Sequence, residues 1–217
     1  MFDSATARRI MVDGQVRTAD VHNVDLLAAM LTIPRERFVP PSMAERAYID
    51  SDTDIAPGRV LLKPMVFAKL IEAADVRAVD HALDVGCGLG YSSAVLSRLA
   101  ASVVALEEDA SLASQTKVAL AAAGAFGVTV KTGPLTAGWP VGAPYVFILL
   151  NGAAEVVPDG FASQLKPGGR LACIFGRGPA TKAMIFRIAE GHLVGRPAFD
   201  AAAPVLPGFV APPAFVF

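Results

Sequence analysis

The sequence predicts an α/β fold with a mostly parallel central sheet, and three observations lead to this prediction. From His81 onward, short apolar runs alternate with helix-compatible segments, which is the pattern that parallel sheets require. The first run ends at the alternating glycines Gly86, Gly88 and Gly90, which indicate a tight turn from a strand into a helix. The second run lies about twenty residues further on and ends at Glu107. This Rossmann-like order places both strand ends at one edge of the sheet.

The alternation also predicts the individual elements. The expected strands are 82–86, 102–107, 127–132, 145–150 and 170–175, and the expected helices are 91–100, 110–123, 155–164 and 180–190. A helical extension precedes them: residues 3–18, a segment opening at Asn23 or Asp25, and a segment opening at Pro64 are helix-compatible. Residues 51–59 are expected to form a loop, because they are polar and contain a Pro-Gly pair.

The chain divides into two parts on this reading. Residues 1–80 form an N-terminal helical cap with a substrate-side loop, and residues 81–217 form a Rossmann-like cofactor-binding domain, packed together as one compact unit. The tail from Pro197 onward is rich in proline and is expected to be extended. Its last part, 204–217, is apolar and uncharged. This segment is expected to pair along the edge of its own sheet or to lie across a partner subunit.

Composition excludes several classes of function. The chain has 217 residues and a formal net charge of −1, and it lacks the basic cluster that a nucleic-acid partner requires. The most apolar stretch, 145–150, is too short to cross a membrane, and the N-terminus shows no signal pattern. Three scattered histidines and two cysteines, Cys87 and Cys173, give no support to a metal site or a disulfide framework. We therefore expect a cytoplasmic protein without a metal.

The glycine turn and the two acidic residues beside it predict a nucleoside-containing cofactor. A carboxylate at the end of the second strand, here Glu107, can accept hydrogen bonds from both ribose hydroxyls. Dinucleotide-binding proteins carry G-x-G-x-x-G, whereas the spacing here is G-x-G-x-G followed by Tyr91. Asp84 would repel a pyrophosphate but suits the cationic end of S-adenosylmethionine. We therefore predict S-adenosylmethionine, with Asp84 and the turn residues Gly86, Cys87, Gly88 and Gly90 as contacts alongside Glu107.

Five segments between residues 30 and 176 carry the motifs of one enzyme family. They are 33–40, 47–50, 84–91, 138–145 and 164–171. The Pro-Arg-Glu-x-Phe-Val-Pro and Gly-Trp-Pro-x-x-Ala-Pro-Tyr runs among them are far more specific than the glycine turn, which many methyltransferases share. On these motifs the chain resembles the protein-L-isoaspartate O-methyltransferases. The resemblance implies an S-adenosylmethionine-dependent methyltransferase fold and a protein-repair enzyme that esterifies the free carboxylate of isoaspartyl residues.

The chain departs from this family at the substrate end. The family's usual Thr-Ile-Ser-Gln-Pro is matched here by 60–64, so that Leu62 stands where a hydroxyl would meet the substrate carboxylate. Lys63 is then a candidate contact for that carboxylate, or simply a solvated lysine at a helix start. The family's Gly-Asp-Gly, whose aspartate meets the adenine amine, becomes Gly133, Pro134 and Leu135, which leaves apolar contact with adenine.

Two functional hypotheses follow. The first is an S-adenosylmethionine-dependent protein carboxyl O-methyltransferase that acts on isoaspartyl residues or a related acceptor, with a protein or peptide partner and a possible homodimer. The second is a relative that has lost this activity and acts through interactions. Asp84, the glycines and Glu107 favour the first, and the changes at Leu62 and Pro134 favour the second.

Overall fold

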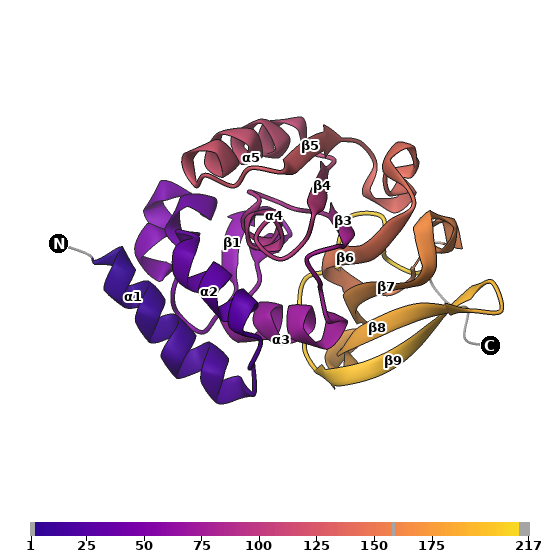
Figure 1. The fold of residues 1–217 in the computed structure, drawn as a ribbon, viewed down its shortest axis with the longest axis horizontal. Helices are drawn as coiled ribbons and strands as arrows, with labels where there is room; N and C mark the ends of the chain where they lie inside the picture. The colour runs from indigo at the N-terminus through magenta and orange to yellow at the C-terminus, as the bar shows by residue number, and fades with distance from the viewer. Residues whose placement is uncertain (1–2, 158, 213–217) are drawn as a thin grey trace.

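A seven-stranded sheet with five α-helices organises the part of the chain that the computed structural model describes, residues 3–157 and 159–212 (Figure 1). The sheet order is β5-β4-β3-β6-β7-β8-β9. Strands β3 to β7 run parallel to one another, β8 runs antiparallel to β7, and β9 runs antiparallel to β8. The strands are β3 (His81–Val85), β4 (Ser102–Glu107), β5 (Val128–Thr132), β6 (Tyr145–Ala154), β7 (Leu165–Phe175), β8 (Lys182–Ala189) and β9 (His192–Asp200). The predicted α/β class and its mostly parallel sheet are confirmed.

The two faces of the sheet are covered differently. Side chains alternate along each strand, so Phe147 and Leu149 of β6 face the helices, whereas Ile148 and Leu150 face the other side. Helices α3 (Pro64–Ala74), α4 (Tyr91–Leu96) and α5 (Ala110–Ala122) pack on the first face, and α1 (Ser4–Met11) and α2 (Val24–Thr32) pack outside them as part of the same core (Figure 1). The second face is covered by 3-10 turns and loops, among them Leu135–Ala137, Pro140–Gly142 and Asp159–Gln164.

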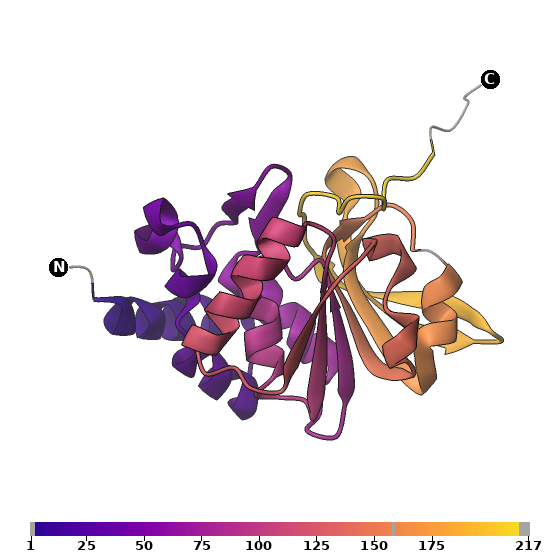
Figure 2. The same ribbon diagram turned by 90° about the horizontal axis from the view of Figure 1, so that it is seen from above.

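The N-terminal extension is helical, as predicted, but it also contributes a hairpin. Strands β1 (Thr53–Ala56) and β2 (Arg59–Leu61) pair antiparallel where the sequence indicated a loop. The Pro-Gly pair is the hairpin turn, since Gly58 adopts a positive φ of 68°. The predicted loop is therefore correct only for this turn, and the two short strands that flank it correct the prediction. In Figure 2 the hairpin lies at the upper end of the central strands, their carboxyl ends.

Two predicted helices are wrong. Most of the segment 180–190 forms strand β8 (Lys182–Ala189) instead, which pairs with β7 on one side and β9 on the other. The helix predicted over 155–164 is replaced by the end of β6 at Ala154 and a 3-10 turn over Asp159–Gln164. Gly160 within that segment disfavours a regular helix. Both errors fall in the second half of the chain, where helices do not alternate with strands.

The apolar tail packs on its own sheet, at the carboxyl end of β6. Strand β3 ends opposite Leu150, which leaves the following residues of β6 unpaired on that side. Val205 fills the place by a parallel bridge to Ala153, and the Leu206 N–H donates to the Ala153 carbonyl at 2.8 Å. Pairing within the chain is thus confirmed for this part of the tail, although not along an outer strand. The rest of the predicted apolar segment, 213–217, lies outside the described residues.

No helix among the described residues has both the length and the apolar character that a membrane span needs.

Candidate functional site

The glycine turn joins β3 to α4 at the carboxyl edge of the sheet, as the sequence predicted. Gly86, Gly88 and Gly90 all have positive φ angles, of 75°, 58° and 96°, which L side chains rarely adopt. The Gly86 N–H donates to the Leu106 carbonyl at 2.9 Å and thereby ties the turn to the end of β4. Cys87 is buried within the turn, and burial raises the pKa of its thiol.

Asp84 lies completely buried on the helical face of β3. Its Oδ2 atom accepts hydrogen bonds from the hydroxyls of Ser92 (2.6 Å) and Ser93 (2.5 Å) in the first turn of α4. Its Oδ1 atom has no hydrogen-bond partner among the described residues. Burial raises the pKa of Asp84 to about 6, although the serine hydroxyls oppose the shift. The site therefore holds a buried carboxylate with one free acceptor, which a cationic group would satisfy.

The raised pKa of Asp84 predicts how stability depends on pH. The unfolded carboxyl ionises near pH 4, whereas the folded one ionises at about 6, so the free energy of unfolding should fall as pH rises from 4 to 6. A difference of about two pKa units corresponds to about 3 kcal/mol. Asp84→Asn should remove this decline and be the more stable protein at pH 7. Urea unfolding between pH 4 and 7 measures it.

The exposed Asp50 offers the matched control for this experiment. Asp50→Asn should keep the pH profile of the parent protein. If Asp84→Asn also keeps that profile, Asp84 is ionised in the folded protein at low pH, and the burial argument is wrong.

Glu107 is fully buried at the end of β4 and forms an ion pair with Arg59. Its two oxygens accept a bidentate pair of hydrogen bonds from Arg59, at 2.8 Å from Nη1 and 2.7 Å from Nη2. The backbone N–H groups of Gly88, Glu108 and Asp109 donate to the same carboxylate at 2.9, 3.1 and 3.3 Å. Burial alone would lower the pKa of Arg59, but the hydrogen bonds and charge of Glu107 raise it. Glu107, which the sequence predicted to bind a ribose, is thus paired with an arginine from the β1–β2 hairpin.

Three side chains lie over the backbone of the glycine turn. They are Ile55, Arg59 and Leu206, which we call the cover. A Cβ atom built at Gly86 would lie 3.0 Å from Leu206 Cδ2 and 3.3 Å from Arg59 Nη2. A side chain at Gly88 would collide with Ile55. The hairpin and the tail therefore meet over the surface where the sequence placed a ligand, and Figure 2 shows both at the upper end of the sheet.

The remaining predicted site residues lie apart from this cluster or make other contacts. Lys63 is half-buried at the start of α3, and its backbone N–H donates to Asp52 at 2.7 Å. Pro134 is exposed, whereas Leu135 is buried in the core of the second sheet face. Contact of Lys63 with a substrate, and of Pro134 and Leu135 with adenine, stay predictions.

A buried arginine that the sequence analysis did not single out links the extension to the site. Arg35 belongs to the Pro-Arg-Glu-x-Phe-Val-Pro motif, and its Nη2 donates to the Leu62 carbonyl at 2.6 Å. Its guanidinium lies 4.7 Å from the ring centre of Tyr91, which also packs against Phe38 and Phe67. The motif therefore fixes the base of the hairpin against the first residue of α4. Glu36 and Arg37 are also charged, so the motif itself gives no signal that distinguishes Arg35.

Comparison with known proteins agrees with this architecture. The family model for protein-L-isoaspartate(D-aspartate) O-methyltransferase (PCMT) matches residues 8–196. The chain belongs to this family. A protein-L-isoaspartate O-methyltransferase of Methylorubrum extorquens (strain PA1) is 40% identical over 169 residues, which cover 78% of this chain and 74% of the relative. One from Pelotomaculum thermopropionicum is 38% identical, with 79% and 75% covered.

Solved structures of the PCMT family share the fold. A beta-aspartate methyltransferase (PCMT) from Plasmodium falciparum, in complex with S-adenosyl-L-homocysteine, superposes with a TM-score of 0.79 at 16% identity, covering 95% of this chain and 99% of that one. A protein-L-isoaspartate O-methyltransferase structure gives a TM-score of 0.78 at 24% identity, covering 93% and 66%. PCMT proteins use S-adenosylmethionine as cofactor. The relatives named here are described as methyltransferases, which gives no support to the hypothesis of lost activity.

The two ends of the predicted cofactor site differ in how well they fit S-adenosylmethionine. The free Oδ1 atom of Asp84 suits the ammonium group of the cofactor. Glu107 has no acceptor position left for ribose hydroxyls, because five donors already converge on its two oxygens. With the cover in place, the residues do not fit the cofactor. This is the main way in which the site departs from what the sequence predicted.

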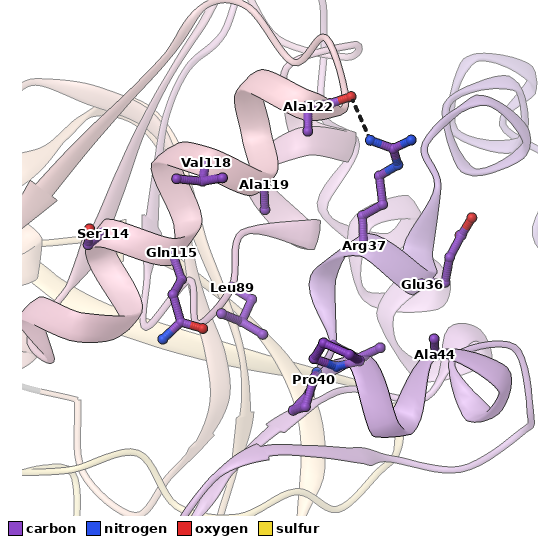
Figure 3. Close-up of a pocket in the computed structure, with 12 residues that line it drawn as sticks. Glu36, Arg37, Pro40, Ala44, Leu89, Ser114, Gln115, Val118, Ala119 and Ala122 are labelled. Carbon is purple, nitrogen blue, oxygen red and sulfur yellow. Dashed lines mark hydrogen bonds between the residues drawn. The ribbon is translucent and has the colours of Figure 1, made fainter.

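A cavity of about 630 Å³ lies between the N-terminal extension and α5 and reaches the glycine turn at Leu89 (Figure 3). Leu89 of the turn lines it, and Val118 and Ala119 of α5 face it across from Pro40. Arg37 closes one end by donating to the Ala122 carbonyl at 3.2 Å. The cavity does not include Asp84 or Glu107.

Proposed function

We propose that this protein is an S-adenosylmethionine-dependent carboxyl O-methyltransferase acting on isoaspartyl residues of proteins or on a related carboxylate acceptor. The proposal rests on membership of the PCMT family, together with the buried Asp84 whose Oδ1 atom has no partner among the described residues. The cofactor supplies the methyl group. The acceptor carboxylate is ionised near neutral pH, so this chemistry needs neither a general base nor a nucleophilic side chain.

The residues of this chain then position the acceptor and exclude water. The cavity between α5 and the extension is open to the surface and ends at Leu89, beside the glycine turn. We assign this cavity to the part of the acceptor polypeptide around the reacting carboxylate, since Lys63 lies outside its lining. Leu62, at the end of the hairpin, has no hydroxyl to offer a carboxylate, whereas Lys63 next to it carries a positive charge. A carboxylate that leaves water needs such partners, so Lys63 is the candidate contact.

We expect slow transfer to isoaspartyl peptides. A lost hydrogen bond to a charged group weakens an interaction by about 1.5–3 kcal/mol, which is about tenfold or more in rate. A labelled-methyl assay, run beside the Methylorubrum relative, should therefore show turnover at least about tenfold lower on the same peptide. The same peptide with ordinary aspartate is the control and should receive no label. Turnover equal to that of the relative would contradict this prediction but leave the proposed function standing.

The finer assignments belong to the same proposal. A cytoplasmic location is supported by two buried, unpaired cysteines, Cys87 and Cys173, which suit a reducing compartment. A homodimer and the absence of a nucleic-acid partner remain expectations from the sequence.

A further inference from the structure

Arg59 competes for the position that the cofactor's ribose requires, and this inference rests on the proposed function. A carboxylate offers about four acceptor positions. Glu107 receives two hydrogen bonds from Arg59 and three from backbone N–H groups. The backbone donors belong to the glycine turn and to the start of α5, which the fold holds in place. Two ribose hydroxyls can therefore be accommodated only if the Arg59 guanidinium leaves.

The hairpin that carries Arg59 is built to move at its tip. It consists of two strands of four and three residues that pair only with each other, and isolated two-stranded hairpins are marginally stable. Its base is fixed, because Asp52 accepts from the Lys63 N–H and the Leu62 carbonyl accepts from Arg35. Its tip contacts the site through Ile55 and Arg59. A rotation about the base would thus withdraw both side chains together.

The tail completes the closed arrangement from the other side. Leu206 lies against Gly86, next to Arg59, and it is held there by backbone hydrogen bonds between Ala153 and the tail at 2.8 and 2.9 Å. The tail is therefore anchored more firmly than the hairpin tip. Of the cover residues, Arg59 alone carries charge and binds Glu107 directly, so it is the residue whose release decides access.

We propose that Arg59 sets the affinity of this protein for its cofactor: the Arg59–Glu107 pair must break before a ribose can bind Glu107. The hairpin tip then competes with the ribose of the cofactor for Glu107. Replacing Arg59 with an uncharged residue should tighten binding of the nucleoside, and cofactor binding should release the hairpin in the parent protein.

Calorimetry with S-adenosyl-L-homocysteine tests this proposal without turnover. Arg59→Gln should lower the Kd at least tenfold relative to the parent, and Arg59→Lys, which keeps the charge but loses the bidentate contact, should fall between them. The lysine variant carries the test if the glutamine variant does not fold. Arg170→Gln is the matched control, because Arg170 forms a similarly buried pair with Asp80 at the opposite end of the sheet. That variant should bind as the parent does.

Hydrogen exchange supplies a second readout. Saturating S-adenosyl-L-homocysteine should speed amide exchange in residues 53–61 of the parent protein, because the tip loses its contact with Glu107. Equal Kd values for the parent and both Arg59 variants would overturn the proposal and leave the proposed function intact. An equal gain in Arg170→Gln would also overturn it, since general loosening would then be the cause. No binding by any variant would overturn both the proposal and the proposed function.

Discussion

Glu107→Ala should lower the free energy of unfolding by about 3–5 kcal/mol, the usual cost of removing one partner from a buried ion pair. The substitution leaves the Arg59 guanidinium, only 7% exposed, without its carboxylate. It also leaves three backbone N–H groups without their acceptor. This large effect is expected because Glu107 serves as a structural partner in the closed arrangement, whatever its role toward a cofactor. Urea unfolding at pH 7 measures it.

Two further variants separate the ion pair from other causes of instability. The double variant Arg59→Met/Glu107→Ala should recover part of the loss, because it leaves no buried charge behind. Asp200→Ala breaks the exposed pair with Lys182 and should not change stability measurably. If Glu107→Ala behaves like Asp200→Ala, the hairpin is open in solution for most of the time. In that case Arg59 does not compete for Glu107.

The parallel part of the fold could be predicted because its signals are local. Strands β4 and β6 each contain a continuous apolar run, and positive-φ glycines mark the turn after β3. Asp84, the glycines and Glu107 reach one edge of the sheet because parallel strands place their carboxyl ends together. These placements needed no information about distant contacts.

Strand β8 ends in a tight turn that the sequence marks only with Gly191. Glu190 and Gly191 both have positive φ, of 52° and 83°, and a two-residue loop of this kind joins antiparallel strands. The helix predicted over 180–190 instead continues the strand-helix alternation of the preceding segments. The sheet ends in an antiparallel hairpin, so the rule that predicts the first strands does not apply to the last two.

The closure of the site could not be predicted from local sequence. Arg59 and Glu107 are 48 residues apart, and Leu206 lies far beyond both. Nothing in the Pro-Gly loop indicates that its arginine reaches the end of β4. The sequence does indicate that Glu107 needs a hydrogen-bond donor, because it is an acidic residue at the end of a buried strand. It does not indicate whether that donor is a ribose hydroxyl or a side chain of the protein.

Leu206→Ala should lower the melting temperature by roughly 10 °C. Leu206 is 2% exposed and packs against Gly86 and Gly152. Truncating a buried leucine costs about 2–5 kcal/mol, and each kcal/mol corresponds to about 2–4 °C in a protein of this size. Val210, 62% exposed in the same segment, is the matched control, and Val210→Ala should leave the melting temperature unchanged. Calorimetric scanning measures both variants.

The same variant separates the two roles of the tail. Because Leu206 packs within its own chain, Leu206→Ala should keep the sedimentation mass of the parent; a change in mass would show that the tail contributes to an assembly instead. Leu206 also covers Gly86 beside Arg59, so the variant should bind S-adenosyl-L-homocysteine more tightly while it unfolds more easily. A general packing defect would weaken both properties. If the Leu206 side chain closes the site, the variant should therefore have a lower melting temperature and a higher affinity for S-adenosyl-L-homocysteine.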